Sequence, residues 1–281
     1  MRTPKDPKDP KDPKDPKDLK DLKDPKDLIT LKPHPMILEV CVGSLQSAIA
    51  AKQGGAARIE LCAALEIGGI TPSAGLMEAA RAVEGLKMHV LIRPRGGDFL
   101  YDKGEVGCMI HDIRLAKQYG ADGIVIGALH ADGSIDTEAC RRMIYAAEGM
   151  QITFHRAFDM CADPLRALET IHDLGCHRLL TSGCAPTALE GLPLLRQLTA
   201  MQTGVIIMPG CGVKSTNVAE IIRGCGATEV HASARKSFAS AMTYRPESVK
   251  MGNPDQDEFA RSETDEQEVR ALVAQLETVK D

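Results

Sequence analysis

The feature that most constrains the fold is a regular alternation of short β-rich runs with segments of helical period. Several helical segments are followed by a glycine where a helix should end, just before the next β-rich run. Eight strand–helix units in about 250 residues are typical of a single-domain α/β fold, the (β/α)8 TIM-like barrel. A doubly wound open sheet competes, but no GxGxxG motif follows the first run and that fold needs fewer units. The runs are 37–42, 57–62, 88–92, 122–126, 151–155, 177–181, 204–208 and 227–232.

The first 35 residues have a different character from the rest. Residues 4–27 are eight consecutive triplets in which Lys-Asp follows Pro six times and Leu twice. Such a segment has too few apolar side chains to offset the entropy lost on ordering. We therefore expect a disordered Lys-Asp/Pro repeat extension over 1–35 and a barrel with a C-terminal loop and helix over 36–281. Met36 directly precedes the first run, so we expect it to be the natural start and the extension to be dispensable.

The composition excludes several classes of protein. The net charge is -5, and residues 1–35 hold ten basic and eight acidic groups, so the remainder carries -7. This mild acidity, with only 4 Tyr, 5 Phe and no Trp, argues against a nucleic-acid partner. No apolar run is long enough to cross a membrane, and the N-terminus lacks the apolar stretch of a signal peptide, so we expect a cytoplasmic protein. The 9 cysteines, an odd number without a CxxC pair, should then be reduced thiols.

The polar face of the β-rich runs is unusual for a barrel. Side chains alternate with period two, so the apolar face should pack against helices and the other face should point into the barrel. TIM-barrel interiors are usually filled with Val, Ile and Leu. Here the inward face contains Glu39, Cys41, Arg58, Glu60, Cys62, His89, Leu91, Arg93, Gln151, Thr153, His155, Glu229, His231 and Ser233.

Burying so many ionisable groups is costly unless they are paired. We expect ion pairs that join Glu39 or Glu60 to Arg58 or Arg93. One interpretation is a purely structural network. The other is a functional site, because charged clusters with perturbed pKa values concentrate at such sites.

Seven stretches of the sequence together resemble the CutC family, whose members are labelled copper homeostasis proteins. The resemblance runs from about Met36 to Tyr244, and the Lys-Asp repeat has no counterpart in it. It implies a cytoplasmic TIM-like barrel that binds copper and forms a homo-oligomer, a dimer or tetramer. The stretches are 38–42 (LEVCV), 58–62 (RIELC), 68–73 (GGITPS), 92–99 (IRPRGGDF), 153–159 (TFHRAFD), 180–183 (LTSG) and 229–235 (EVHASAR).

Cys41 and Cys62 give the copper hypothesis a physical form. They lie at the carboxyl ends of the first and second runs, each two residues after an inward Glu. If these strands are neighbours at about 4.8 Å, two inward thiols at equal height could bind one Cu(I), which favours soft sulfur donors. The resemblance attributes copper ligation to these positions. The alternative is that both are small buried apolar residues. Four further sulfur-bearing residues on the same side could add ligands: Met160, Cys161, Met208 and Cys211.

A second hypothesis is an uncharacterised enzyme. TIM barrels carry their chemistry at the carboxyl ends of the strands, where several candidate residues converge. Histidine and buried carboxylates could exchange protons, and Arg93 and Arg95 could hold a carboxylate or phosphate. A histidine in a barrel can also be an ordinary core residue. The candidate acid–base residues are Glu39, Glu60, His155, Asp159 and His231.

The loops after the seventh and eighth runs suggest a small anionic or phosphorylated ligand. TIM barrels frequently bind phosphate there, and Gly210 and Gly212 would let the backbone approach an anion. Ser233 and Arg235 follow the eighth run.

The loop 93–101 is either a lid that folds over an anion or a rigid loop pinned by an Arg95–Asp98 pair. Residues 237–262 could pack across the barrel or against another subunit.

The sequence thus leads to two functional hypotheses. The first is a cytoplasmic Cu(I)-binding copper homeostasis protein with Cys41 and Cys62 as ligands. The alternative is a TIM-barrel enzyme acting on a small anion. A pure interaction scaffold is disfavoured because it does not need a charged barrel mouth.

Overall fold

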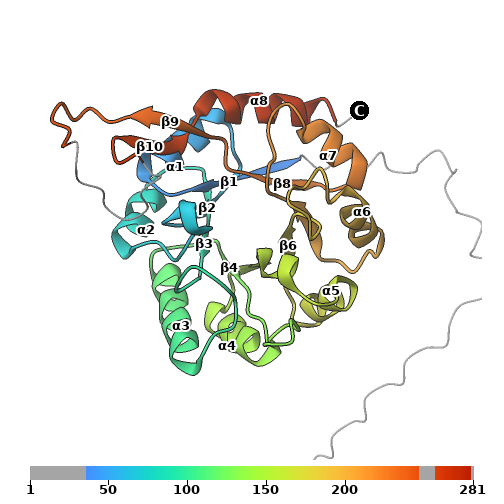
Figure 1. The fold of residues 1–281 in the computed structure, drawn as a ribbon. Coiled ribbons are helices and arrows are strands. Elements are labelled where there is room, and N and C mark those ends of the chain that lie inside the picture. Colours follow the sequence, from blue (N-terminus) through green and yellow to red (C-terminus); the bar gives the residue numbers. More distant parts are fainter. Residues whose placement is uncertain (1–35, 247–256, 280–281) are drawn as a thin grey trace, which may run out of the picture. The chain divides into compact units, whose positions relative to one another are not determined.

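Eight parallel strands form a nearly closed barrel surrounded by helices (Figure 1). The computed structural model describes residues 36–246 and 257–279, so the Lys-Asp repeat lies outside the described residues. The strands pair in the order β7-β6-β5-β4-β3-β2-β1-β8, which confirms the predicted (β/α)8 fold. Each strand overlaps one predicted run: β1 Ile37–Val42, β2 Arg58–Leu61, β3 Lys87–Leu91, β4 Gly123–Ile126, β5 Gln151–Phe154, β6 Arg178–Thr181, β7 Ile206–Pro209 and β8 Glu229–Ala232.

The helices begin and end at recognisable capping residues. The Asp163 side chain accepts the backbone N–H of Arg166, and Pro164 is the first residue of α5. Gly55 and Gly226 end α1 and α7 in the left-handed conformation. The helices are α1 Leu45–Gly54, α2 Ala74–Arg81, α3 Lys103–Gln118, α4 Thr137–Ala147, α5 Pro164–Asp173, α6 Leu192–Ala200, α7 Val218–Cys225 and α8 Glu266–Glu277, with short 3-10 turns η3 Leu65–Ile67 and η4 Arg156–Met160.

The apolar core lies between the strands and the helices. Val40, Ile59 and Phe154, from the predicted outward face, are fully buried there. A separate small cluster inside the barrel contains Cys41, Cys62, Leu91 and Val125. The two faces therefore separate as the period-two pattern predicted.

Helix α8 covers the outside of the barrel beside α1 and α7 (Figure 1). It approaches α1 so closely that a Cβ atom on Gly54 would lie 2.4 Å from Cβ of Val269. Only glycine fits at this contact. Among the described residues, no helix combines the length and the apolar character needed to span a bilayer.

A two-stranded antiparallel hairpin follows the barrel and has no counterpart in the sequence prediction. It consists of β9 Arg235–Ala239 and β10 Ala260–Thr264. The backbone N–H of Thr264 donates to Oγ of Ser47, and Oγ of Ser47 donates to Glu263 at 2.6 Å. These bonds attach β10 to α1 on the outside of the barrel (Figure 1).

Candidate functional site

A buried network of charges occupies the barrel interior. The Arg58 guanidinium contacts the carboxylates of Glu39 and Glu229, and Nε of Arg178 lies 3.0 Å from Glu229. All four side chains are at most 8% exposed. The predicted Glu39–Arg58 pair is therefore confirmed, and positive and negative charges balance within the network.

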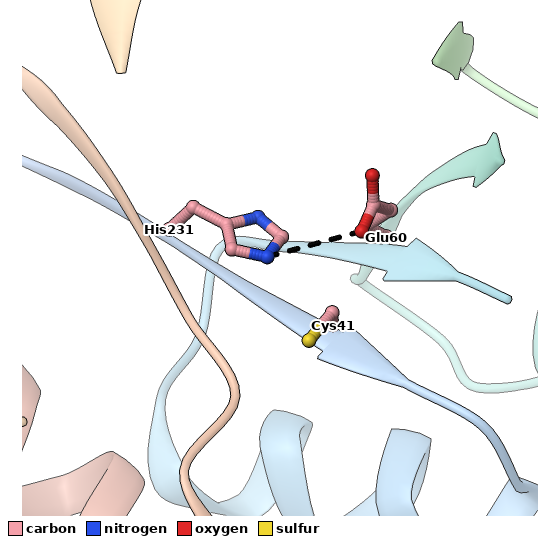
Figure 2. A group of neighbouring side chains, drawn as sticks. All are labelled: Cys41, Glu60 and His231. Atoms are coloured by element: carbon pink, nitrogen blue, oxygen red, sulfur yellow. Dashed lines mark ion pairs between the residues drawn. The ribbon is translucent and has the colours of Figure 1, made fainter. Parts of the chain in front are cut away.

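Next to this network, three side chains converge on one point. A ligand atom from each of Cys41, Glu60 and His231 lies within 4.8 Å of the other two, and all three residues are buried. Figure 2 shows their side chains pointing toward one another. They come from the adjacent strands β1, β2 and β8, in which Cys41 is opposite Glu60 and Glu39 is opposite His231. The barrel therefore holds a thiol, a carboxylate and an imidazole at metal-binding spacing.

The orientation of His231 is fixed by two carboxylates. Its Nδ1 lies 2.8 Å from Oε1 of Glu39, and its Nε2 lies 3.8 Å from Oε2 of Glu60, the contact dashed in Figure 2. A carboxylate that accepts the Nδ1 proton fixes the ring and leaves Nε2 to face Glu60. A carboxylate behind a histidine in this way is the usual support of a metal-binding imidazole.

Electrostatics distinguish the two carboxylates. Burial opposes the charged form of Glu39, but Arg58 and His231 outweigh it and hold the Glu39 pKa well below its usual range. Burial raises the pKa of Glu60 to about 7, although His231 opposes this. Burial alone would lower the pKa of His231, but its hydrogen bonds with Cys41 and Glu39 raise that pKa well above its usual value.

Cys62 lies near Cys41 but is not at the same level. The strand register pairs Cys41 with Glu60, so Cys62 lies two residues beyond the level of Cys41, just past the end of β2. The expected equal height of the two thiols is therefore wrong, because period-two alternation fixes the face of a strand and not its register. The Cys62 thiol donates instead to the carbonyl oxygen of Val42 at 3.4 Å. Burial raises the Cys62 pKa well above its usual value, and the nearby Cys41 and Glu60 add smaller effects in the same direction.

A cavity of about 250 Å³ opens at the carboxyl ends of the strands, next to the three converging residues. It brings together most of the sequence-predicted residues. Its walls include the predicted residues Cys41, Glu60, Arg93, His155, Gly212, His231, Ser233 and Arg235.

The two arginines of the loop 93–101 differ in position. Arg93 lines the cavity, but its guanidinium donates to the carbonyl oxygens of Ile67, Gly69 and Gly97 and makes no ion pair with Glu39 or Glu60. Backbone carbonyls thus replace the expected carboxylate partner.

Arg95 lies outside the cavity walls. It pairs with Asp98 at 3.1 Å and with Glu105 at 2.5 Å, and its guanidinium lies over the Tyr101 ring. Of the two alternatives for this loop, the structure favours the pinned loop.

Two other predicted residues have structural contacts instead of facing the cavity. The Asp159 carboxylate accepts the backbone N–H groups of Ser182 and Cys184 at 3.1 Å and pairs with Arg156 at 2.8 Å. A Cβ atom on Gly210 would lie 2.5 Å from Cδ1 of Leu180, so this glycine permits close packing.

Met208, one of the further candidate sulfur ligands, accepts a hydrogen bond from Arg58 at 3.3 Å. Three charged or aromatic residues of the interior and the cavity were not singled out from the sequence. Arg178 completes the charge network. Arg156 and Phe99 line the cavity. Inward alternation in β6 would have identified Arg178, whereas Arg156 and Phe99 come from a turn and a loop, which carry no periodic signal.

The comparisons with known proteins agree on one family. A family model described as "CutC family" matches residues 36–236. The chain is 50% identical over 240 residues to a mouse (Mus musculus) protein named copper homeostasis protein cutC homolog, covering 85% of this chain and 88% of that protein. A Bacteroides thetaiotaomicron family protein CutC is 49% identical, covering 82% of this chain and 94% of that protein.

Solved structures are similar to the chain in fold. A CutC structure from Streptococcus agalactiae has a TM-score of 0.67 and 30% identity, and covers 70% of this chain and 98% of its own. The thiamine phosphate pyrophosphorylase from Pyrococcus furiosus has a TM-score of 0.54 at 15% identity, covering 87% of this chain and 97% of its own. This second similarity concerns the barrel fold alone.

Proposed function

The chain belongs to the CutC family, and from this premise we propose that it binds Cu(I) inside the barrel. The proposed ligands are the Cys41 sulfur and Nε2 of His231, with the Glu60 carboxylate beside them. The observation that carries the proposal is that ligand atoms of these three buried residues lie within 4.8 Å of one another. One small ion could therefore contact all three.

The chemistry of these donors suits copper. Cu(I) favours thiolate, and imidazole is a common copper ligand, whereas a site for a hard cation such as Mg²⁺ would consist of oxygen atoms. Both ligands must lose a proton to bind the metal, so copper competes with protons at the site. Glu39 supports the arrangement by accepting the Nδ1 proton of His231 at 2.8 Å.

Cys62 remains a proposed second sulfur ligand. It belongs to the same interior cluster as Cys41, but its thiol donates to the Val42 carbonyl oxygen. Ligation by Cys62 requires that this hydrogen bond be replaced by a bond to the metal. We therefore expect Cys41 to contribute more to copper affinity than Cys62.

The test is a Cu(I) titration of the full chain against a competing chelator under reducing conditions. We expect one Cu(I) per chain in the unmodified protein and loss of tight binding in Cys41→Ser and His231→Asn. Cys108→Ser is the matched control, because Cys108 is an exposed thiol on α3. Unchanged affinity in Cys41→Ser would reject the site. Equal losses in Cys62→Ser and Cys41→Ser would make both thiols ligands.

Glu39→Gln tests the support behind His231. The amide keeps the shape of the side chain but accepts the Nδ1 proton more weakly, so we expect Cu(I) affinity to fall about 10–100-fold. The same titration measures the effect, with circular dichroism as the check that the barrel is intact. Full affinity in a folded Glu39→Gln protein would contradict the proposed support of His231 by Glu39.

We further propose a reducing compartment, the cytoplasm, and a dimer or tetramer. All nine cysteines are free, which supports a reducing environment. The association is supported by large apolar side chains exposed on β9 and in the segment that follows it, namely Phe238, Met242 and Tyr244. Native mass spectrometry measures the assembly, and a single-chain mass at micromolar concentration would contradict it.

A further inference from the structure

The cavity at the barrel mouth carries positive charge on an acidic protein. Three arginines, Arg93, Arg156 and Arg235, stand in its walls, whereas Glu60 is the one carboxylate among the described residues that line it. The chain as a whole has a net charge of -5. Cations gathered within low-dielectric walls favour a negatively charged ligand.

The buried donor in this cavity is His155. Its Nδ1 accepts the backbone N–H of Ala157 at 3.1 Å, so the proton of the neutral ring resides on Nε2. This Nε2 is buried and has no hydrogen-bond partner among the described residues. The residue lines the cavity and is 4% exposed. Buried polar groups in proteins normally have a hydrogen-bond partner, and a ligand in the cavity can supply the acceptor for Nε2–H.

The position of His155 is fixed by the residues around it. Its ring centroid lies 4.9 Å from that of Phe99, and the Arg93 guanidinium lies 5.0 Å from the centroid of the same Phe99 ring. Arg93 is itself tied to three backbone carbonyls, and its Nε is also buried without a partner among the described residues. These donors are therefore already oriented before a ligand arrives.

Two further arginines stand at the more exposed edge of the cavity. Arg156 is directed by Asp159 at 2.8 Å and by Oγ of Ser182 at 3.2 Å. Arg235 begins β9, is exposed, and forms no ion pair among the described residues. Ser233 adds a hydroxyl from the end of β8. The cavity thus offers a buried neutral donor and two cations nearer solvent.

We propose that this cavity binds a small molecule through an oxyanion group, a phosphate monoester or a carboxylate. Nε2–H of His155 donates to one anionic oxygen, and Arg156 and Arg235 neutralise the charge. The volume of about 250 Å³ lies below the roughly 300–1,000 Å³ of pockets for drug-sized ligands, so the ligand is small. Cys41, Glu60 and His231 share the wall of the cavity, so the anion lies beside the proposed copper site without depending on it.

The experiment uses the full chain without copper and three probes: inorganic phosphate, glycerol 3-phosphate and succinate. Calorimetry measures affinity, and NMR of ¹⁵N-labelled histidine follows Nε2–H of His155. We expect at least one probe to bind and to shift this resonance. Preference for the phosphate probes or for succinate identifies the head group.

Two variants and one control decide whether the cavity is the site. Arg235→Gln changes an exposed residue, and His155→Phe keeps an aromatic ring while removing the donor. Each should weaken binding about tenfold or more, since a hydrogen bond to a charged group contributes roughly 1.5–3 kcal/mol. Arg270→Gln, on the exposed face of α8, should change affinity less than about twofold, as expected of a surface ion pair.

The failure of this proposal can be separated from the failure of copper binding. Arg235→Gln leaves the proposed copper ligands intact, so it should lose anion affinity and keep Cu(I) binding. Equal affinity in Arg235→Gln and Arg270→Gln would mean non-specific attraction and would overturn the site. The absence of binding by all three probes at millimolar concentration would overturn it as well.

Discussion

His231 and His155 use their ring nitrogens in opposite ways. Nδ1 of His231 pairs with the Glu39 carboxylate, whereas Nδ1 of His155 accepts a backbone N–H from Ala157. The first arrangement favours a protonated ring, since the hydrogen bonds with Cys41 and Glu39 outweigh burial and raise the pKa. The second favours a neutral ring. Burial and the nearby Arg93 charge lower the pKa of His155 to about 3. The same residue type therefore has a ring held by a carboxylate on β8, where we propose a metal ligand, and a neutral donor just after β5.

We predict that His155 stays neutral from pH 8 to pH 5. Its folded pKa of about 3 lies below the usual value of 6.5, so folding excludes a proton between these two values. The stability that depends on the neutral ring is complete above about pH 6.5 and is lost as the pH falls toward 3. Imidazole ¹⁵N shifts measured by NMR test this directly. A midpoint for His155 near 6.5 in the folded protein would contradict it.

We predict that Cys184 reacts faster with iodoacetamide than the other exposed thiol, Cys108. A hydrogen bond with the Cys161 thiol lowers the pKa of Cys184, and the thiolate is the reactive form. Mass spectrometry at neutral pH compares the two labelling rates. Cys161→Ala should slow labelling at Cys184 and leave Cys108 unchanged. Equal rates at Cys108 and Cys184 in the unmodified chain would show that the hydrogen bond does not activate the thiol.

The ion network joins elements that are distant in sequence. Arg58 on β2 contacts Glu39 on β1 and Glu229 on β8, and Arg178 reaches Glu229 from β6. Strands β7 and β8 are the two ends of the hydrogen-bonded order, so the barrel is nearly closed. The Arg178–Glu229 pair crosses from β6 to β8 and thus connects the two sides of that junction. This supports a structural role for the network alongside the site.

We predict that Arg58→Met destabilises the protein by about 3–5 kcal/mol. Methionine has a similar length but leaves the buried Glu39 carboxylate without its cation, which is far costlier than losing an exposed pair. Urea unfolding of the copper-free protein measures the change. The control is Arg81→Gln, whose pair with Asp122 is about one-third exposed at the arginine, with an expected cost below about 1 kcal/mol. Similar losses in both variants would contradict a special role for burial.

The sequence predicts which strands form and which face of each strand points inward, but it does not predict the register between neighbouring strands. Glu39 and Arg58 were expected to pair because period-two alternation puts both inside the barrel. The same alternation does not determine the register that places Cys41 opposite Glu60, because the register depends on hydrogen bonds between strands. The β9–β10 hairpin was missed because most of its residues are exposed and lack an apolar alternation. Arg93 was assigned a carboxylate, but loop carbonyls, which no pattern reveals, hold it instead.

At the scale of the molecule, charge is segregated. The chain is acidic, yet most of the charged side chains that line the cavity at the barrel mouth are arginines, and the network beside it balances two carboxylates with two guanidinium groups. Net charge therefore says little about the ligand. The local field at the carboxyl ends of the strands, not the overall charge, should attract an anion. The same end of the barrel holds Cys41 and His231, so metal and anion would meet in one place.

We predict that a chain starting at Met36 folds and binds Cu(I) like the full chain. The barrel begins with β1 at Ile37, and its apolar core includes Leu38 and residues after it. Thermal unfolding should therefore shift by less than about 2 °C, the change expected for a few tenths of a kcal/mol. A chain starting at Gly43 is the control. It lacks β1, which pairs with both β2 and β8 and carries Glu39 and Cys41, so it should not fold. Aggregation or a large loss of stability in the Met36 chain would assign the first 35 residues a part in the fold.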